Sequence, residues 1–146
     1  MQTSLRDFLE NHEFKRIPLK KLLTGHYKLT LQINNIKGDF ILDTGASTSC
    51  IGVNDIEYFK LKNEASKVKA AGAGAINMDT QLAPNNSLII GGKLLHGIDF
   101  VLFDLTHVND ALGQVQEKPI NGILGAELLK HLRAVIDYGR NCLYIK

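Results

Sequence analysis

The segment Phe40–Cys50, FILDTGASTSC, constrains this chain more than any other stretch. The apolar run Phe40–Leu42 leads directly into Asp43, which is followed by Thr-Gly-Ala-Ser. A carboxylate is costly to bury, so a strand that carries one into a sheltered place holds a group whose ionisation depends on its surroundings. Two interpretations follow: Asp43 is a turn residue that ends a strand, or it is a reacting group. The triplet Asp-Thr-Gly does not by itself choose between them.

The residues before Asp43 predict a β-hairpin. Apolar residues alternate with polar ones over 29–33, which is the pattern of a half-buried strand. Asn34-Asn35 and Gly38 supply turn residues, and the apolar second arm runs straight into Asp43.

The rest of the chain predicts short strands with a few short helices. Helices are expected over 4–13, where Ser4 and Asp7 can cap the first turn, over 55–61 and from residue 127 onward. Strands are expected over 17–19, on both sides of the glycine-rich stretch 71–75, over 88–95 with a turn at Gly91-Gly92, and over 98–105, 120–125 and 134–146. Residues 105–118 are polar and predict a loop with room for one helical turn. The pattern is that of a β-rich domain.

The composition predicts a single soluble domain with a core of its own. The chain has 146 residues, of which 45% are apolar and 22% are charged. The 17 basic and 15 acidic residues leave a net charge of +2, which does not indicate a nucleic-acid partner. Two cysteines make no disulfide framework, and no window has the length and hydrophobicity of a membrane span. We therefore expect a cytoplasmic protein with reduced thiols and no membrane partner.

Several catalytic templates do not fit. The sequence around Ser47 resembles a G-x-S-x-G elbow but lacks its second glycine, and Gly72–Asn77 lacks the third glycine of a dinucleotide fingerprint. The five histidines are scattered without metal-ligand spacing. Cys50 has no basic partner in the sequence, which favours a buried thiol over a nucleophile.

Three segments together resemble the retropepsin-like aspartic proteases. They are FILDTGAST, the glycine-rich AAGAG and NGILGAELLKHLRAVIDY, and they occur in the order seen in that family. The similarity covers residues 27–146. It implies a mostly-β, half-barrel acid-protease fold with short helices that forms a two-fold dimer. The protease domain would span residues 17–146, and residues 1–16 would be a helical appendage or a removable pro-segment.

The resemblance also implies a mechanism. In this family two aspartates flank one water: one carboxylate takes its proton, and the other carboxyl group donates a proton to the scissile carbonyl. Carboxyl groups this close share a proton, because both cannot ionise. This chain has one Asp-Thr-Gly. Asp137 also follows an apolar pair, Val135-Ile136, but the next residue is Tyr138, so it does not form a second such loop. The family chemistry therefore implies an aspartic endopeptidase that is a homodimer, with Asp43 from each chain and a peptide or protein substrate.

Roles for further residues come from the same similarity. Thr44 would hydrogen-bond across the dimer axis, and Gly45 would let the backbone pass close to the carboxylate. Ala46 matches the retroviral type, whereas Ser47 stands where many retroviral enzymes have an acidic residue, so the contacts of that residue do not carry over. No cofactor and no metal are implied. The assigned residues are Thr44, Gly45, Ala46 and Ser47 in the active-site loop, Ala71, Gly72, Ala73 and Gly74 in a flap over the substrate, and Leu124 and Gly125 packed under the loop.

Two other hypotheses remain open at this stage. The first is a non-catalytic dimeric domain that binds peptides or acts as a scaffold on the same fold. The second is an unrelated small β-domain that binds a ligand or a protein.

Overall fold

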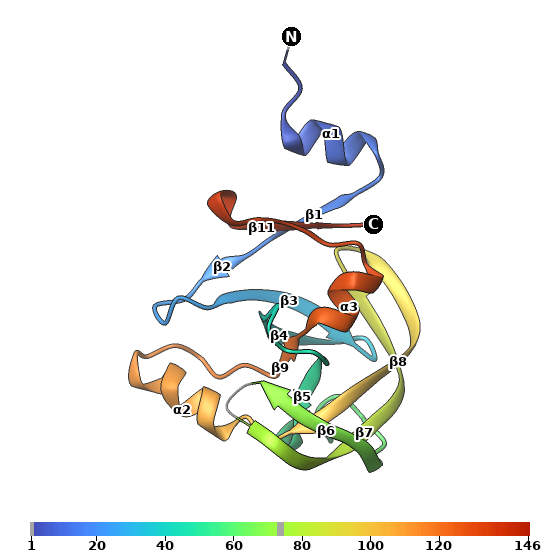
Figure 1. Ribbon diagram of the computed structural model, residues 1–146, viewed down its shortest axis with the longest axis vertical. Coiled ribbons are helices and arrows are strands. Elements are labelled where there is room, and N and C mark those ends of the chain that lie inside the picture. The colour runs from blue at the N-terminus through green and yellow to red at the C-terminus, as the bar shows by residue number, and fades with distance from the viewer. Residues whose placement is uncertain (1, 73–74) are drawn as a thin grey trace.

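The computed structural model describes residues 2–72 and 75–146, with side chains outside residues 65–80. Figure 1 shows α1 at one end of the molecule, β5, β6 and β7 at the other, and the C-terminus beside β1 and β11. The helices are α1 (Leu5–Asn11), α2 (Thr106–Gln114) and α3 (Ala126–His131), with 3-10 turns at Val53–Asp55 and Tyr138–Arg140. The strands are β1 (Lys15–Pro18), β2 (Lys20–Lys21), β3 (Tyr27–Ile33), β4 (Ile36–Leu42), β5 (Cys50–Gly52), β6 (Glu64–Gly72), β7 (Ala75–Ile90), β8 (Lys93–Phe103), β9 (Gly122–Leu124), β10 (Val135–Asp137) and β11 (Cys142–Ile145).

The predicted hairpin that leads to Asp43 is β3 and β4. Its two-residue turn is made by Asn34 and Asn35, whose φ angles are 52° and 66°. Asparagine tolerates this left-handed region, and two such residues make the turn that matches the twist of a hairpin. Leu29 and Leu31 of β3 are buried whereas Thr30 is exposed, so the alternation in the sequence does mark the inner face.

A closed barrel forms the body of the molecule. The large sheet has the order β2-β3-β4-β9-β5-β8-β7-β6, and an additional antiparallel pairing of β3 with β7 joins Ile33 to Leu88. The ring β3-β4-β9-β5-β8-β7 therefore closes on itself, so each of these six strands has a partner on both sides. Neighbouring strands are antiparallel except for β4 with β9 and β5 with β8, which are parallel.

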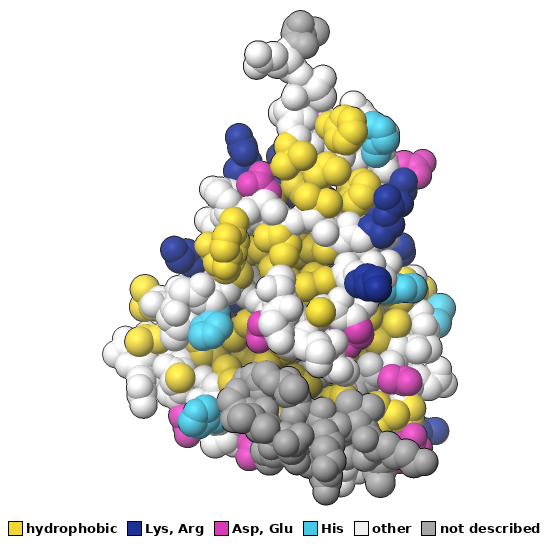
Figure 2. All heavy atoms as spheres, viewed as in Figure 1, with side chains coloured by type: hydrophobic (Ala, Val, Ile, Leu, Met, Phe, Trp, Pro, Cys, Tyr) yellow, Lys and Arg dark blue, Asp and Glu magenta, His cyan; other side chains and the backbone are white. Residues whose placement is uncertain are grey.

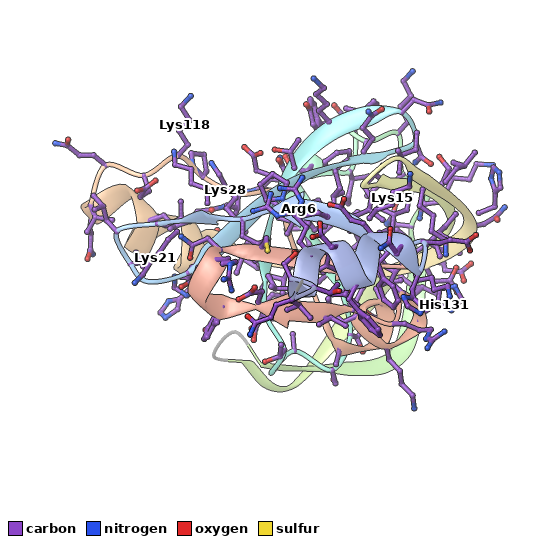
Figure 3. All side chains as sticks on the ribbon, turned by 90° about the horizontal axis from the view of Figure 1, so that it is seen from above. Arg6, Lys15, Lys21, Lys28, Lys118 and His131 are labelled. Atoms are coloured by element: carbon purple, nitrogen blue, oxygen red, sulfur yellow. The ribbon has the colours of Figure 1, made fainter. Side chains whose placement is uncertain are left out.

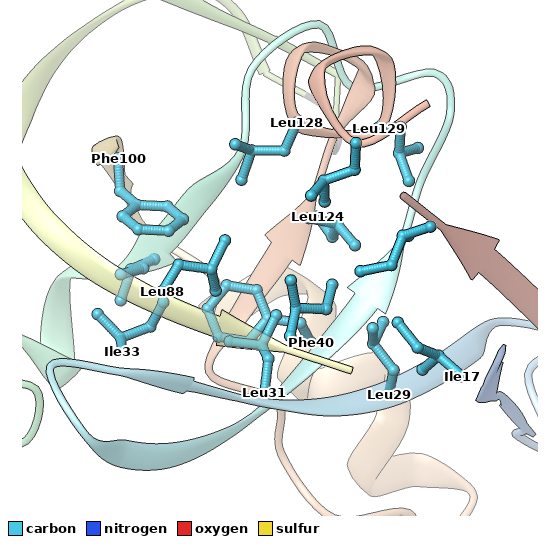
Figure 4. Close-up of a cluster of buried hydrophobic side chains, with 14 of the residues drawn as sticks. Ile17, Leu29, Leu31, Ile33, Phe40, Leu88, Phe100, Leu124, Leu128 and Leu129 are labelled. Carbon is cyan, nitrogen blue, oxygen red and sulfur yellow. The ribbon is translucent and has the colours of Figure 1, made fainter. Parts of the chain in front are cut away.

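The barrel encloses the main hydrophobic core. Figure 4 shows side chains from the barrel strands and from α3 meeting in one cluster, with Phe40, Leu88 and Leu124 fully buried. Gly38 lies inside β4 rather than in the turn where the sequence placed it. A side chain there would lie 2.6 Å from the Phe59 ring, so the glycine makes room for an aromatic ring of the core.

A second, three-stranded sheet lies at the end of the barrel near the chain termini. Its order is β1-β11-β10, and all pairings are antiparallel. Helix α1 packs on it through Leu9, and Ser4 Oγ accepts a hydrogen bond from the Asp7 amide, as the capping prediction requires. Leu5 and Phe8 on α1 are exposed, and apolar side chains gather at the α1 end of the face in Figure 2.

Besides the placement of Gly38, two predictions of local structure were wrong. Residues 55–61 do not form a helix: a 3-10 turn ends at Asp55, irregular turns follow, and Lys60 takes a φ of 55°. Phe59 and Leu61 are both buried in the core, and the irregular turns place these two side chains there. Residues 105–118 are not a loop, because α2 occupies most of them and buries Leu112.

Charged side chains are distributed around the molecule. The six basic residues labelled in Figure 3 come from six different elements or loops, and the exposed Lys118 extends away from the body. Lys28 of β3 pairs with Asp39 of β4 at 3.8 Å. Over the described ranges 2–72 and 75–146, no helix is long and apolar enough to span a bilayer.

Candidate active site

Asp43 follows directly after β4 and lies at the end of β9. Strands β4 and β9 run in parallel with Leu42 opposite Leu124, and the Asp43 amide donates to the Leu124 carbonyl oxygen at 3.0 Å. After the loop of residues 43–49 the chain returns as β5, which pairs with the other side of β9 in antiparallel fashion. The loop therefore crosses the end of β9, and the strands before and after it, β4 and β5, pair with the two sides of β9.

The loop holds the Asp43 carboxyl group with its own backbone. The Gly45 amide donates to Asp43 Oδ1 at 2.8 Å, and the Ala46 amide donates to the Asp43 carbonyl oxygen at 3.2 Å. A side chain at residue 45 would lie 3.2 Å from Asp43 Oδ1, so glycine leaves room for this close approach. Asp43 is half-buried, and Thr44 and Gly45 are exposed, so the carboxyl group remains within reach of another molecule.

Other residues of the loop divide between core and solvent. Ala46 is buried, and its carbonyl oxygen accepts a hydrogen bond from the Ala126 amide at 2.7 Å. Ser47 is exposed, so it does not take part in the interior packing of the loop. Ser49, at the end of the loop, is completely buried.

Leu124 and Gly125 form the floor beneath the loop. Leu124 is fully buried in the barrel core, and its carbonyl oxygen holds the Asp43 amide. A side chain on Gly125 would lie 2.7 Å from the Ala46 carbonyl oxygen and 3.1 Å from the Ser49 nitrogen, both of them backbone atoms. Only glycine allows the loop to lie this close to the start of α3.

Glu127 is a loop-supporting residue that the sequence reasoning missed. It lies in the first turn of α3, and its carboxylate accepts hydrogen bonds from both the amide and the hydroxyl of Ser49. The Ser49 hydroxyl in turn accepts from the Gly125 amide at 2.8 Å. One signal was present in the sequence: a lone acidic residue inside the otherwise apolar run Ile123–Leu129.

A pocket of about 510 Å³ opens beside Asp43. The Tyr27 and Tyr138 rings lie 5.0 Å apart between their centres. The Nδ1 atom of His26 is 2.6 Å from Thr24 Oγ1. The lining residues of the pocket are Gly25, His26, Tyr27, Leu42, Asp43, Thr44, Ile136 and Tyr138. Sequence reasoning did not identify most of them as site residues, because they come from β3, the loop before it and the C-terminal hairpin.

The glycine-rich hairpin is present as strands β6 and β7. Its arms are antiparallel, and Gly72 lies opposite Ala75. Ala71 and Gly72 are the last residues of β6, whereas Ala73 and Gly74 lie outside the described residues.

Metal-binding side chains do not gather in this region. Within the described part of the chain, no three histidine, cysteine, aspartate or glutamate side chains are close enough to hold a metal ion. Cys50, which follows the loop, is buried, and this burial raises the pKa of its thiol to about 12.

Comparison with known proteins agrees with this geometry. A family model described as aspartyl protease matches residues 29–128, which is more than half of the chain. The match includes the Asp-Thr-Gly loop, the glycine-rich hairpin and β9. The comparison with curated protein sequences gives no significant match.

Solved structures show the same fold at low sequence identity. A retropepsin-like aspartic protease from Rickettsia conorii superposes with a TM-score of 0.60 and 21% identity, covering 90% of this chain and 91% of that one. The EIAV protease, solved with the inhibitor HBY-793, gives a TM-score of 0.57 and 21% identity over 79% and 95% of the two chains. The retroviral protease-like domain of Ddi1 from Leishmania major gives 0.55 and 16% identity over 82% and 86%. The chain therefore belongs to the aspartyl protease family and has the retropepsin-like fold.

Proposed function

We propose that this protein is an aspartic endopeptidase that acts as a homodimer, with the Asp43 carboxyl groups of two subunits around one water. The observation that carries the proposal is the position of Asp43 in a chain of this family. Its carboxyl group is half-buried, is held by the Gly45 amide at 2.8 Å and lies at the edge of an open pocket. A second subunit and a substrate can both reach a group placed in this way.

The proposed reaction needs only these two carboxyl groups and water. As the water oxygen attacks the carbonyl carbon of the peptide bond, one Asp43 carboxylate takes its proton, and the protonated Asp43 of the other subunit donates a proton to the carbonyl oxygen. The tetrahedral intermediate then loses a hydroxyl proton to the ionised carboxylate. The C–N bond breaks, and the nitrogen takes the proton of the other carboxyl group, so the products are an amine and a carboxylic acid.

The surface around Asp43 is suited to a two-fold partner. Thr44 is exposed next to Asp43, and we propose that it hydrogen-bonds to the same loop of the partner subunit. Tyr138 in the pocket wall is 67% exposed, so its ring offers the partner an apolar surface to cover.

The β6–β7 hairpin is the proposed flap. Its arms pair from Glu64 opposite Leu82 to Gly72 opposite Ala75, and we propose that they close over an extended peptide and exclude water from the reaction. Ala71 and Gly72, together with Ala73 and Gly74 outside the described part, are the proposed contacts with the peptide backbone.

Replacement of Asp43 by asparagine tests the proposal. We expect Asp43→Asn to abolish cleavage of a peptide library between pH 4 and 7.5, because an amide can neither take nor donate the required proton. Mass spectrometry of the products measures cleavage, and sedimentation shows whether the dimer is kept. The matched control is Asp110→Asn, an exposed aspartate on α2, which we expect to cleave like the parent protein.

The outcomes separate the proposal from its alternative. Cleavage by the Asp43→Asn dimer at the parent rate would overturn the role of Asp43. Peptide binding without cleavage at any pH, by parent protein shown to be dimeric, would instead support a non-catalytic peptide-binding or scaffold domain.

A further inference from the structure

The end of the active-site loop is held by a carboxylate from another element. Ser49 is completely buried, and both of its donors, the backbone amide and the hydroxyl, point to Glu127. The amide donates to Oε2 and the hydroxyl to Oε1, so one residue is held by both oxygens of one carboxylate. The Leu128 amide also donates to Glu127 Oε1, at 2.9 Å, which helps to fix the carboxylate itself.

A carboxylate satisfies all three of these donors. It is an acceptor at both oxygens, and hydrogen bonds to a charged acceptor are stronger than those between neutral groups. Glutamine at residue 127 would have one acceptor oxygen, and its NH₂ group would face one of the two Ser49 donors. If the NH₂ took the place of Oε1, the Ser49 hydroxyl could accept from it with its second lone pair, besides the bond from the Gly125 amide at 2.8 Å. The Ser49 hydroxyl proton and the Leu128 amide would then both lose their acceptor at a completely buried residue.

The loop is attached to the β9–α3 junction by two backbone bonds and by Ser49, whose bonds with Glu127 and with the Gly125 amide depend on side chains. The Asp43 amide binds the Leu124 carbonyl oxygen at 3.0 Å, and the Ala126 amide binds the Ala46 carbonyl oxygen at 2.7 Å. Both of these are backbone bonds that most substitutions would keep. The Ser49–Glu127 contact, between residues 78 positions apart, is where a change of one side chain can loosen the loop.

We propose that Glu127 is a positioning residue for Asp43, acting through Ser49. This inference rests on the proposed function, in which the Asp43 carboxyl groups of two subunits must meet around one water. Five residues, 44–48, separate Asp43 from Ser49, so a displacement of Ser49 is passed to the carboxyl group over a short segment whose middle residue, Ala46, is buried. Rates are steep in this geometry: a misplacement of about 1 Å costs about 100-fold. Ser47 is exposed, so the side chain that connects the loop to Glu127 is that of the buried Ser49.

Glu127→Gln tests the inference, with Glu57→Gln as the matched control. Glu57 is exposed and lies in the turns after β5, away from the loop. We expect Glu127→Gln to lower kcat by about 10- to 100-fold with KM changed less than about 3-fold, because the substrate surface stays and the reacting group moves. Rates are counted per active site, titrated with a tight-binding inhibitor, so that unfolded protein does not contribute. We expect Glu57→Gln to leave both constants unchanged.

Variants of Ser49 test whether Glu127 acts through this residue. Ser49→Ala removes the hydroxyl, and we expect it to lower kcat as Glu127→Gln does. The double variant should lose no more than either single variant, since the two residues form one unit. A double variant whose losses multiply would overturn the coupling. Ser49→Ala also provides the measurement if Glu127→Gln does not fold.

Hydrogen exchange gives a second readout that does not depend on activity. We expect the Gly45 and Ala46 amides, which bind Asp43, to exchange faster in Glu127→Gln than in Glu57→Gln. Unchanged kcat per active site and unchanged exchange would overturn the role of Glu127 while the proposed function stands. A lower active fraction with the parent kcat would reduce Glu127 to a stabilising residue and also overturn it. Absence of cleavage in the parent protein would contradict the proposed function, and exchange would still decide whether Glu127 positions the loop.

Discussion

Cys50, next to the loop of residues 43–49, has a thiol whose reactivity is lowered by burial in the barrel. It begins β5 directly after Ser49, and the residue is 7% exposed. Burial raises the pKa of Cys50 to about 12, and a hydrogen bond with the backbone of Ile123 offsets this only in part. Because the thiolate is the nucleophile, Cys50 is a packing residue at neutral pH.

The raised pKa of Cys50 predicts a loss of stability at alkaline pH. The thiol pKa is about 12 in the folded protein against an ordinary value of 9.0. Below pH 9 both states keep the proton and the contribution is fully present. Between pH 9 and 12 only the unfolded chain releases it, so the free energy of unfolding falls as pH rises, by up to about 1.4 kcal/mol per pH unit. Urea unfolding at pH 8 to 10.5 should show this slope, reduced in Cys50→Ala. The same slope in both proteins would contradict the assignment.

At the scale of elements, the junction between β9 and α3 organises the active-site loop. Strand β9 is only three residues long, yet it pairs with β4 on one side and β5 on the other. Its last residue holds Asp43, and Gly125 and Glu127 hold Ser49. The loop therefore takes its shape from the junction on which it rests, more than from its own turn residues.

Glycine at residue 125 is predicted to be essential for this junction. In Gly125→Ala the new methyl group would lie 2.7 Å from the Ala46 carbonyl oxygen, a backbone atom that cannot move without displacing the loop. We expect a loss of about 1–3 kcal/mol in the free energy of unfolding, together with a large loss of activity. The control is Gly113→Ala in α2, where the methyl group meets nothing within 4 Å and should stabilise by about 0.5–1 kcal/mol. Thermal unfolding of both variants measures the difference. Equal changes in stability for Gly125→Ala and Gly113→Ala would contradict the prediction, because they would show that the loop moves to accommodate the methyl group.

At the scale of the whole molecule, one chain supplies half of the proposed catalytic centre. The sequence has one Asp-Thr-Gly, and the structure places it beside a pocket walled by Tyr27, Ile136 and Tyr138. The barrel is already closed, and α1 lies against the terminal sheet. Among the described surfaces, the one around Asp43 is therefore where we expect the partner.

Activity is predicted to depend on protein concentration. If two Asp43 carboxyl groups are needed, the rate per chain should fall on dilution below the dissociation constant of the dimer. In an equal mixture of parent and Asp43→Asn chains, only about a quarter of randomly formed dimers would hold two aspartates. Peptide cleavage measured over a dilution series and over mixing ratios checks both expectations. A constant rate per chain in the dilution series would contradict the dimeric site.

Sequence patterns alone determined the parts of this protein that rest on neighbouring residues. The alternation over β3 and the turns at Asn34-Asn35 and Gly91-Gly92 identified the hairpins, and the apolar arm of β4 placed Asp43 at a strand end. These signals are local, because side-chain alternation and φ preferences act within a few residues. The same local reasoning failed over 55–61 and 105–118, where burial in the core outweighed the local pattern.

Tertiary structure alone decided what surrounds Asp43. Periodicity tells which face of a strand is buried but not against which partner, so it predicted neither the pairing of β9 with β4 and β5 nor the pocket wall made by Tyr27 and Tyr138. The packing of Leu124 and Gly125 under the loop was expected from the family resemblance alone. The Ser49–Glu127 contact joins residues 78 positions apart. A bond of this kind depends on how the closed barrel brings two distant segments together, and that is a property of the whole fold rather than of either segment.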